Sequence, residues 1–162
     1  MKTERNRKVQ AQQTFRKAYR AQLSGDFARA VELYRKSLDL SPTAEAYTFL
    51  GWTFRVQGKL EEAIAVCKRA IEIDPDFGNP YNDIGAYLIE LQRFDEAVPW
   101  LESAIAAKRY EARHFPYFNL GRVYVAKGEL KRACELFQQA LDIEPRYALA
   151  SQGLESLRRL LN

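Results

Sequence analysis

The chain has 162 residues, of which 47% are hydrophobic and 28% charged, as expected for one globular domain with a buried core. No stretch approaches the roughly 20 apolar residues of a membrane span, and the polar, basic start MKTERNRKVQ argues against a secretory signal peptide, so we expect a cytoplasmic protein. The net charge of +4 is uneven, because residues 1–20 hold seven basic and one acidic side chain, whereas the remainder holds 18 basic and 20 acidic ones.

Residues 1–10 form a basic N-terminal extension, and the positive charge continues to residue 20. A basic arm can bind nucleic acid or acidic lipids, but most charge runs are solvated helix surface, and we favour that interpretation. Residues 11–43 follow as a helix pair that is clear only in its second half, GDFARAVELYRKSLDLSP. Lys17 stands in its first helix where the later units have Leu or Ile.

Residues 44–77, 78–113 and 114–147 repeat one pattern of two amphipathic helices. In each first helix an aromatic residue, Leu or Ile, Gly, and a further Leu or aromatic residue recur at intervals of three, one and three, on one helical face. These sets are Tyr47, Leu50, Gly51 and Phe54; Tyr81, Ile84, Gly85 and Leu88; and Tyr117, Leu120, Gly121 and Tyr124. Glycine costs a helix about 1 kcal/mol relative to Ala, so close helix packing must favour it, and we expect Gly51 to face Ala63.

The turns and the spacing of the units carry further predictions. Gly58 and Gly128 occupy turns between helices, where a positive φ suits glycine. The unit glycines are 34 residues apart from Gly51 to Gly85 but 36 apart from Gly85 to Gly121, so two residues are inserted in the 78–113 unit. Asn79, before a proline, is expected to be a helix N-cap.

The 78–113 unit departs from the pattern at its turn and at its end. Gln92 replaces the turn glycine, and Arg109 replaces the Pro that closes the other units. Its segment AIAAKRYEAR contains no helix breaker. We therefore predict that the second helix runs to about residue 110 or 111, with a slight kink at Pro99 and a short turn at residues 113–114.

The pattern resembles the tetratricopeptide repeat family, and the resemblance covers nearly the whole chain. It implies one all-α domain, a right-handed superhelical solenoid of about nine helices. The expected units are a divergent repeat 1 (11–43), repeat 2 (44–77), repeat 3 with a two-residue insertion (78–113), repeat 4 (114–147) and a capping helix (148–162).

In that family, one face of the first helices lines a concave groove that holds an extended or helical peptide. The groove residues implied here are Tyr19, Thr48, Phe49, Trp52, Arg55, Asn79, Asn82, Asp83, Phe115, Phe118, Asn119 and Arg122. Interfaces favour aromatic residues and Arg, Asn amides can bracket a peptide backbone, and Arg can pair with ligand carboxylates. The alternative, that the aromatic residues pack against the next repeat, stays open.

Some family members clamp acidic C-terminal tails with Lys, Asn and Arg side chains. The matching positions here are Phe15, Tyr19, Phe49, Asn79 and Asp83, so the clamp is missing and binding of chaperone tails is not implied. We expect an amphipathic partner with apolar anchors and at least one acidic group.

The sequence shows no signature of catalysis, since it lacks a phosphate-binding loop, G-x-S-x-G and H-E-x-x-H. His114, the only histidine, is interpreted as a residue at a helix start, and Cys67 and Cys134 as reduced core thiols without metal-ligand spacing. We expect no catalytic residues, no cofactor, no metal site and no small-molecule substrate. The predicted function is a non-catalytic scaffold or adaptor that binds a partner peptide or helix. The alternatives are a self-assembling homo-oligomer and, least favoured, contact with nucleic acid through residues 1–20.

Overall fold

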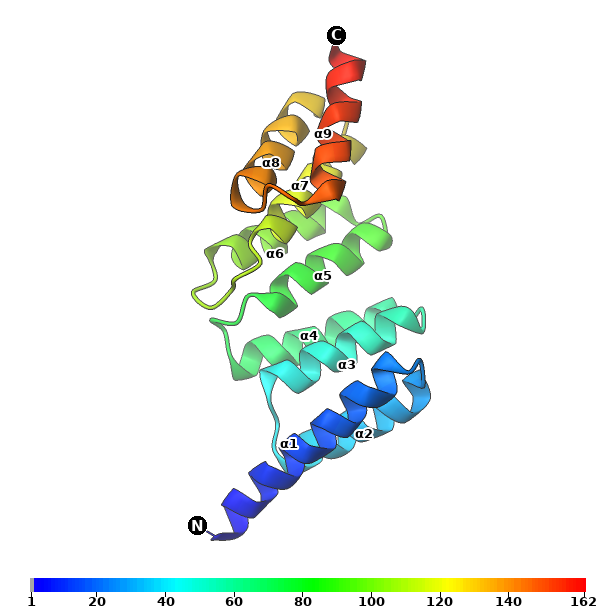
Figure 1. Cartoon of the computed structure of the whole chain (residues 1–162), viewed down its shortest axis with the longest axis vertical. Coiled ribbons are helices and arrows are strands. Elements are labelled where there is room, and N and C mark those ends of the chain that lie inside the picture. Colours follow the sequence, from blue (N-terminus) through cyan, green and yellow to red (C-terminus); the bar gives the residue numbers. More distant parts are fainter. Residues whose placement is uncertain (1) are drawn as a thin grey trace.

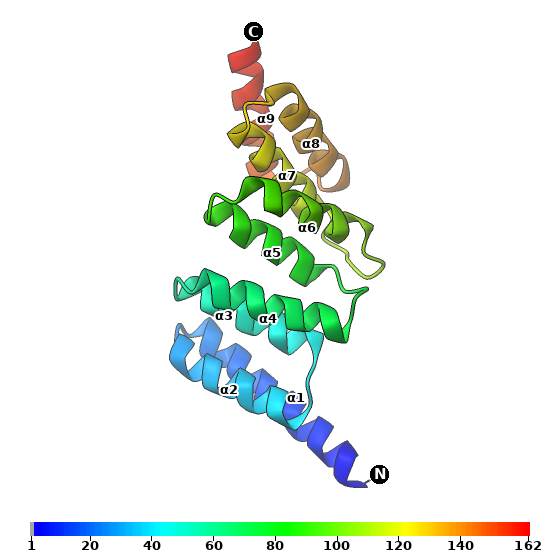
Figure 2. The ribbon, with the colours of Figure 1, turned by 180° about the vertical axis from the view of Figure 1, so that it is seen from behind.

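The computed structural model describes residues 2–162, which fold into nine α-helices and no sheet (Figure 1). The helices are α1 (Lys2–Leu23), α2 (Phe27–Leu40), α3 (Ala44–Val56), α4 (Leu60–Ile73), α5 (Asn79–Glu90), α6 (Phe94–Ala106), α7 (His114–Ala126), α8 (Leu130–Ile143) and α9 (Ala148–Leu161). They stack along the long axis of the molecule, with the two chain ends at opposite ends of the stack (Figures 1 and 2). The prediction of an all-α solenoid of helix pairs is therefore confirmed.

Two surfaces follow from the way in which the helices pack. Each odd-numbered helix from α1 to α7 packs on the even-numbered helix after it, and α9 packs on α8. The odd-numbered helices also contact one another, α1 with α3, α3 with α5 and α5 with α7. For example, α3 lies in front of α4 in Figure 1 and behind it in Figure 2. We call the surface formed by α1, α3, α5, α7 and α9 the odd-helix surface.

Glycine controls both the closeness of the helices and the turns between them. A Cβ added to Gly51 would lie 2.7 Å from the Cys67 sulfur and 3.2 Å from the Ala63 carbonyl oxygen, which confirms that Gly51 faces Ala63 across a close helix contact. Gly58 has the positive φ expected for its turn, +76°. At the matching turn Gln92 adopts φ +59°, a left-handed conformation that non-glycine residues rarely take.

One continuous hydrophobic core runs through the stack from Ala18 to Leu157. Near the first repeat, three of its polar side chains meet at one oxygen atom. The Tyr34 hydroxyl donates to the Gln22 side-chain oxygen (2.8 Å), and the Thr53 hydroxyl approaches the same oxygen (3.2 Å). Cys67 is buried and Cys134 is half-buried, and both are free thiols. The core therefore joins neighbouring repeats rather than filling each repeat separately.

The predicted extension of α6 is wrong, because α6 ends at Ala106 and residues 107–113 form a loop. Tyr110, expected near the helix end, is instead only 5% exposed and lies in a second, small hydrophobic cluster with Ala104 and Ala107. It packs against Gly78, where an added Cβ would lie 2.4 Å from the Tyr110 Cβ. Helix propensity favoured continuation, but burial of the Tyr110 ring against Gly78 stabilises the loop instead.

The carbonyl groups at the end of α6 are satisfied by Arg113. Its guanidinium donates to the backbone oxygens of Ile105 (3.1 Å), Ala107 (2.6 Å) and Tyr110. A helix end leaves its last carbonyl groups without backbone partners, and a basic side chain can bond them. Arg113 thus stabilises the early end of the helix, which the local sequence did not reveal.

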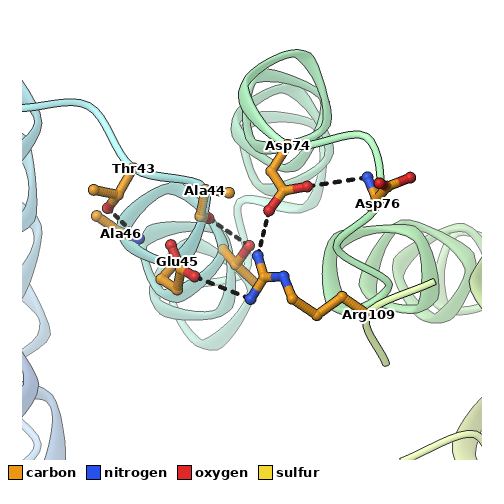
Figure 3. A network of polar contacts seen from close by, with 8 residues as sticks. Thr43, Ala44, Glu45, Ala46, Asp74, Asp76 and Arg109 are labelled. Carbon is orange, nitrogen blue, oxygen red and sulfur yellow. Dashed lines mark hydrogen bonds and ion pairs between the residues drawn. The ribbon is translucent and has the colours of Figure 1, made fainter. Parts of the chain in front are cut away.

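Arg109 stands at the position of the missing Pro and links three segments (Figure 3). Its guanidinium pairs with Asp74 at the end of α4 and with Glu45 in the first turn of α3 (3.4 Å), and it stacks 4.4 Å from the centre of the Phe77 ring. The hydrogen bond from Arg109 lowers the pKa of the Asp74 carboxyl. Its backbone also pairs with the preceding turn, since the Gly78 N–H donates to the Arg109 oxygen (3.1 Å). The loop is therefore tied back onto repeat 2.

The first residues of α5 and α7 differ in part from the predictions. Asn79 is not the N-cap, since Gly78 holds that position and Asn79 is the first residue of α5. The Gly78 carbonyl accepts the first-turn bond from the Asn82 N–H (3.2 Å), and no side chain caps this helix. His114 is the first residue of α7. Pro99 lies inside α6, and the kink there stays a prediction.

Candidate functional site: the odd-helix surface

Exposed apolar side chains gather on the odd-helix surface. Among residues 2–162, twelve large hydrophobic side chains are exposed, and ten of them belong to odd-numbered helices. The two exceptions, Ile73 and Ile143, are the last residues of α4 and α8. Because exposed apolar groups that collect on one side are typical of surfaces that contact another molecule, the odd-helix surface is the candidate site.

The predicted groove residues differ in how far they can be reached by a ligand. Tyr19, Trp52, Arg55, Asn79, Phe115 and Arg122 are exposed; Phe49, Asp83 and Phe118 are half-buried; and Thr48, Asn82 and Asn119 are buried. All twelve lie on α1, α3, α5 or α7. Half of this set can therefore contact a ligand directly, and the rest shape or support the surface.

The aromatic residues near α1 and α3 divide between packing and exposure. Phe49 lies among Phe15, Tyr19 and Tyr34, with ring centres 5.3 to 6.2 Å away, so it fills the interface between repeats 1 and 2. Tyr19 packs on Phe49 with one edge and keeps 39% of its surface exposed, and Trp52 keeps 40%. Phe49 is thus a packing residue, while Tyr19 and Trp52 present apolar area outward.

The two predicted asparagines bond to each other. The Asn119 amide donates to the Asn82 side-chain oxygen (3.0 Å), and the Arg122 guanidinium donates to the Asn119 side-chain oxygen (3.1 Å). This chain of polar groups joins α5 to α7. The amides are therefore engaged within the protein, and Arg122 is the member of the chain that solvent reaches.

The two predicted arginines have different surroundings. Arg55 of α3 pairs with Glu90 of α5 (2.8 Å), so its charge is already matched. Arg122 forms no ion pair with the side chains that the structure describes, and its described polar partner is Asn119. Arg122 is consequently better placed than Arg55 to receive a carboxylate from a ligand.

Asp83 is a half-buried acid in the middle of the surface. Removal from water raises the pKa of the Asp83 carboxyl to about 7, and the neighbouring Asn82 amide offsets this only in part. One helical turn later, the Tyr87 hydroxyl is buried and has no hydrogen-bond partner in the described part of the chain. Two polar groups of α5 are therefore without full compensation.

A pocket of about 750 Å³ lies where α5, α7 and α9 meet. Phe118, Val125, Leu149 and Leu160 provide much of its apolar lining, and Arg122 lies beside them. Leu149 and Leu160 are 55% and 73% exposed, so α9 presents an apolar face into this pocket. The sequence analysis did not include these α9 residues because residues 148–162 were assigned only as a capping helix, although the segment has leucines beyond those needed to pack on α8, namely Leu149, Leu160 and Leu161.

Tyr147, in the turn before α9, is another residue that the sequence did not single out. Its ring packs on His114, Phe115 and Phe118 with centre distances of 5.1 to 5.6 Å. His114 thus belongs to an aromatic cluster at the start of α7, and Phe115 is partly covered by the same cluster. Burial raises the pKa of the Tyr147 hydroxyl, and the positive charge of Arg122 lowers it in part.

Residues 2–162 offer neither a metal site nor a membrane span. No group of three or more His, Cys, Asp and Glu side chains among them is arranged so that it could hold a metal ion. None of the described helices combines the length and the apolar character needed to cross a membrane.

Family comparisons agree with the helical pattern. Models described as tetratricopeptide repeat match residues 15–76 and residues 76–145. BBSome complex member BBS4 of Bos taurus is 26% identical over 124 residues, covering 76% of this chain and 23% of that protein. Small glutamine-rich tetratricopeptide repeat-containing protein 2 of Mycosarcoma maydis is 32% identical over 91 residues, covering 56% and 26%. The chain thus spans about a quarter of the length of these relatives.

Solved structures show the same fold. PilF of Pseudomonas aeruginosa superposes with a TM-score of 0.87 at 22% identity, covering 94% of this chain and 69% of PilF. YrrB, described as a repeat protein with an unusual peptide-binding site, gives 0.74 at 18% identity, covering 90% and 74%. The first repeat domain of Spaghetti (RPAP3), solved with the HSP90 peptide SRMEEVD, gives 0.68 at 23% identity, covering 75% and 94%.

Proposed function

Because the chain belongs to the tetratricopeptide repeat family, we propose that it is a non-catalytic scaffold or adaptor that binds a segment of a partner protein along the odd-helix surface. The observation that carries this proposal is the concentration of exposed apolar side chains on the odd-numbered helices. Two proteins of similar fold, YrrB and the RPAP3 domain, are described with a peptide-binding site or a bound peptide, which supports the same mode of action.

The surface favours an amphipathic segment that carries an acidic group. The pocket between α7 and α9 would take an apolar anchor against Leu149 and Leu160. Trp52 and Tyr19 would take a second apolar group near the other end of the surface, since aromatic side chains dominate binding energies at interfaces. A carboxylate of the partner would pair with Arg122, whose guanidinium meets no acidic side chain of residues 3–162.

Random twelve-residue peptides displayed on phage provide a probe that does not depend on the identity of the partner. Peptides selected on the wild-type chain would be synthesised with a fluorophore, and their binding measured by anisotropy. We expect Trp52→Ala and Leu160→Ala each to weaken binding by about tenfold, as for anchors at interfaces. The matched control is Ile143→Ala, which removes an apolar side chain about as exposed as Trp52 (44% against 40%) from the end of α8 and is expected to change nothing. Equal effects of all three substitutions would contradict the proposal.

Self-association is a second candidate, favoured by the exposure of Leu149, Leu160 and Leu161 on the terminal helix. In this case α9 of one copy would occupy the pocket of another. Sedimentation velocity over a hundredfold concentration range discriminates, because a strict monomer at every concentration would exclude it. Nucleic-acid contact through residues 1–20 remains the least favoured candidate, and absence of binding to DNA and RNA at low salt would end it.

A further inference from the structure

We infer that the odd-helix surface holds a cationic side chain of the partner segment, a lysine or an arginine, against the carboxylate of Asp83. The inference rests on the proposed function, since it concerns the partner bound to that surface. It adds one required chemical group to the partner and fixes where on α5 that group lies.

The position of Asp83 in its repeat is the first argument. The matching residues are Phe49 in repeat 2 and Asn119 in repeat 4. Phe49 is covered by three aromatic rings, and Asn119 is hydrogen-bonded to Asn82. Both neighbours of Asp83 in the stack are therefore satisfied inside the protein. A carboxylate at this place is a departure from the repeat, made at a site where an apolar or neutral residue packs without cost.

The surroundings of Asp83 offer no cation. No ion pair among the described side chains includes Asp83, and Arg55, whose charge acts on the neighbouring Tyr87 hydroxyl, is paired with Glu90. The groups on which the charge of Asp83 acts are the Cys67 thiol of α4, the Tyr87 hydroxyl of α5 and the Tyr110 hydroxyl of the 107–113 loop. None of these three can supply a positive charge.

A second, independent group nearby also lacks a partner. The Tyr87 hydroxyl lies on the same helix one turn after Asp83, and Tyr87 is only 4% exposed. It has no hydrogen-bond partner among residues 2–162. Buried polar groups are almost always hydrogen-bonded, so the buried Tyr87 hydroxyl, one helical turn from a carboxylate that has no counter-ion, marks a place completed by another molecule.

The chemistry of these groups selects the ligand. A half-buried carboxylate without a counter-ion is unfavourable in the free protein, and a lysine or arginine from the partner removes this cost by pairing with it. The same carboxylate repels an acidic group placed at this point and stays uncompensated beside an apolar one, which gives the surface selectivity as well as affinity. Neutral hydrogen-bond donors would satisfy Asp83 without matching its charge.

The inference also orients the bound segment. Arg122 lies at one end of the polar chain that runs through Asn119 to Asn82, and Asp83 lies beside Asn82 at the other end. A basic group placed on Asp83 and an acidic group placed on Arg122 can be satisfied together by only one direction of the segment. The surface is thus expected to recognise a basic residue and an acidic residue in a fixed order.

The test uses the phage library of twelve-residue peptides described above, selected in parallel on the wild-type chain and on Asp83→Asn. Asn keeps the shape of the side chain and removes its charge. The matched control is Glu102→Gln, which neutralises an exposed acid of α6. We expect peptides from the wild type and from the control to share a lysine or arginine at one position, and peptides from Asp83→Asn to lack it.

Binding of one synthetic peptide then measures the pairing. Replacement of its selected basic residue by neutral norleucine is expected to weaken binding to the wild-type chain at least about tenfold and to change binding to Asp83→Asn less than twofold. An equal loss in both proteins, or the absence of a shared basic residue, would overturn the inference. If peptides respond to Leu160→Ala but not to Asp83→Asn, the inference fails and the proposed function stands. If they respond to neither, both fail.

Discussion

Asp83→Asn is expected to stabilise the protein in a manner that depends on pH. The pKa of Asp83 is about 7 in the folded chain, against about 3.9 for an unperturbed Asp in the unfolded chain. The folded state therefore binds more protons than the unfolded state between these values. Asp83 does not lower the free energy of unfolding below pH 3.9, where it is protonated in both states. That free energy then falls as the pH rises toward 7.

The magnitude follows from the difference in pKa. Three pKa units correspond to about 4 kcal/mol, and because the side chain keeps some contact with water we expect about half of this, roughly 2 kcal/mol at pH 8. At pH 5 about a third of this destabilisation is already present, close to 0.7 kcal/mol, as linkage requires. Asparagine removes the charge, so Asp83→Asn gains these amounts over the wild type.

Urea denaturation followed by circular dichroism at pH 5 and pH 8 measures this difference. Glu102→Gln provides the control, since an exposed acid is expected to alter stability by the same small amount at both pH values. A variant Asp83→Asn that is no more stable than the wild type at pH 8 would refute the claim that this carboxylate is uncompensated. A gain of the same size at both pH values would refute the assigned pKa.

Three further substitutions test the account of the fold and of the surface. Gln92→Gly is expected to stabilise the chain by about 1 kcal/mol, because residue 92 has a left-handed φ of +59°; a lower melting temperature would contradict this. Arg113→Ala should lower the free energy of unfolding by about 2 kcal/mol, since three backbone carbonyls lose a charged donor, whereas Lys108→Ala, in the same loop but with an exposed side chain, should change it by less than about 0.5 kcal/mol. Arg122→Gln should weaken a selected acidic peptide about tenfold with little loss of stability, and equal binding would remove Arg122 from the site.

The helix pairs could be predicted from the sequence because their signals are local and repeated. The spacing around Gly51 and its counterparts places apolar residues on one helical face, and the turn glycines mark where helices end. Close packing of Gly51 on Ala63 followed from the same pattern, since a helical glycine requires a steric reason.

The end of α6 could not be predicted in the same way, because the deciding interactions join residues far apart in sequence. Tyr110 packs against Gly78, where the absence of a side chain leaves room for it, and Arg109 forms ion pairs with Asp74 and Glu45. Local helix propensity contains no information about these partners. The engagement of Asn82 with Asn119 escaped prediction for the same reason, since the two lie 37 residues apart.

The candidate surface was predictable in outline and not in detail. Choosing one face of each first helix identified Trp52 and Arg122 as exposed residues. It also included Phe49, which packs between repeats, and it left out Leu149 and Leu160 of α9. Which side chains remain open depends on the neighbouring repeat, and that is a property of the assembled stack.

The central claim, that a partner segment lies along the odd-helix surface, is tested most directly by a ¹⁵N NMR titration with a selected peptide. The two tryptophans provide an internal comparison, because Trp52 lies on α3 and Trp100 on α6. The account predicts that the Trp52 indole signal and the amides of α7 and α9 shift on binding while the Trp100 indole signal stays in place. Shifts that centre on Trp100 and the even-numbered helices, with Trp52 unchanged, would contradict it.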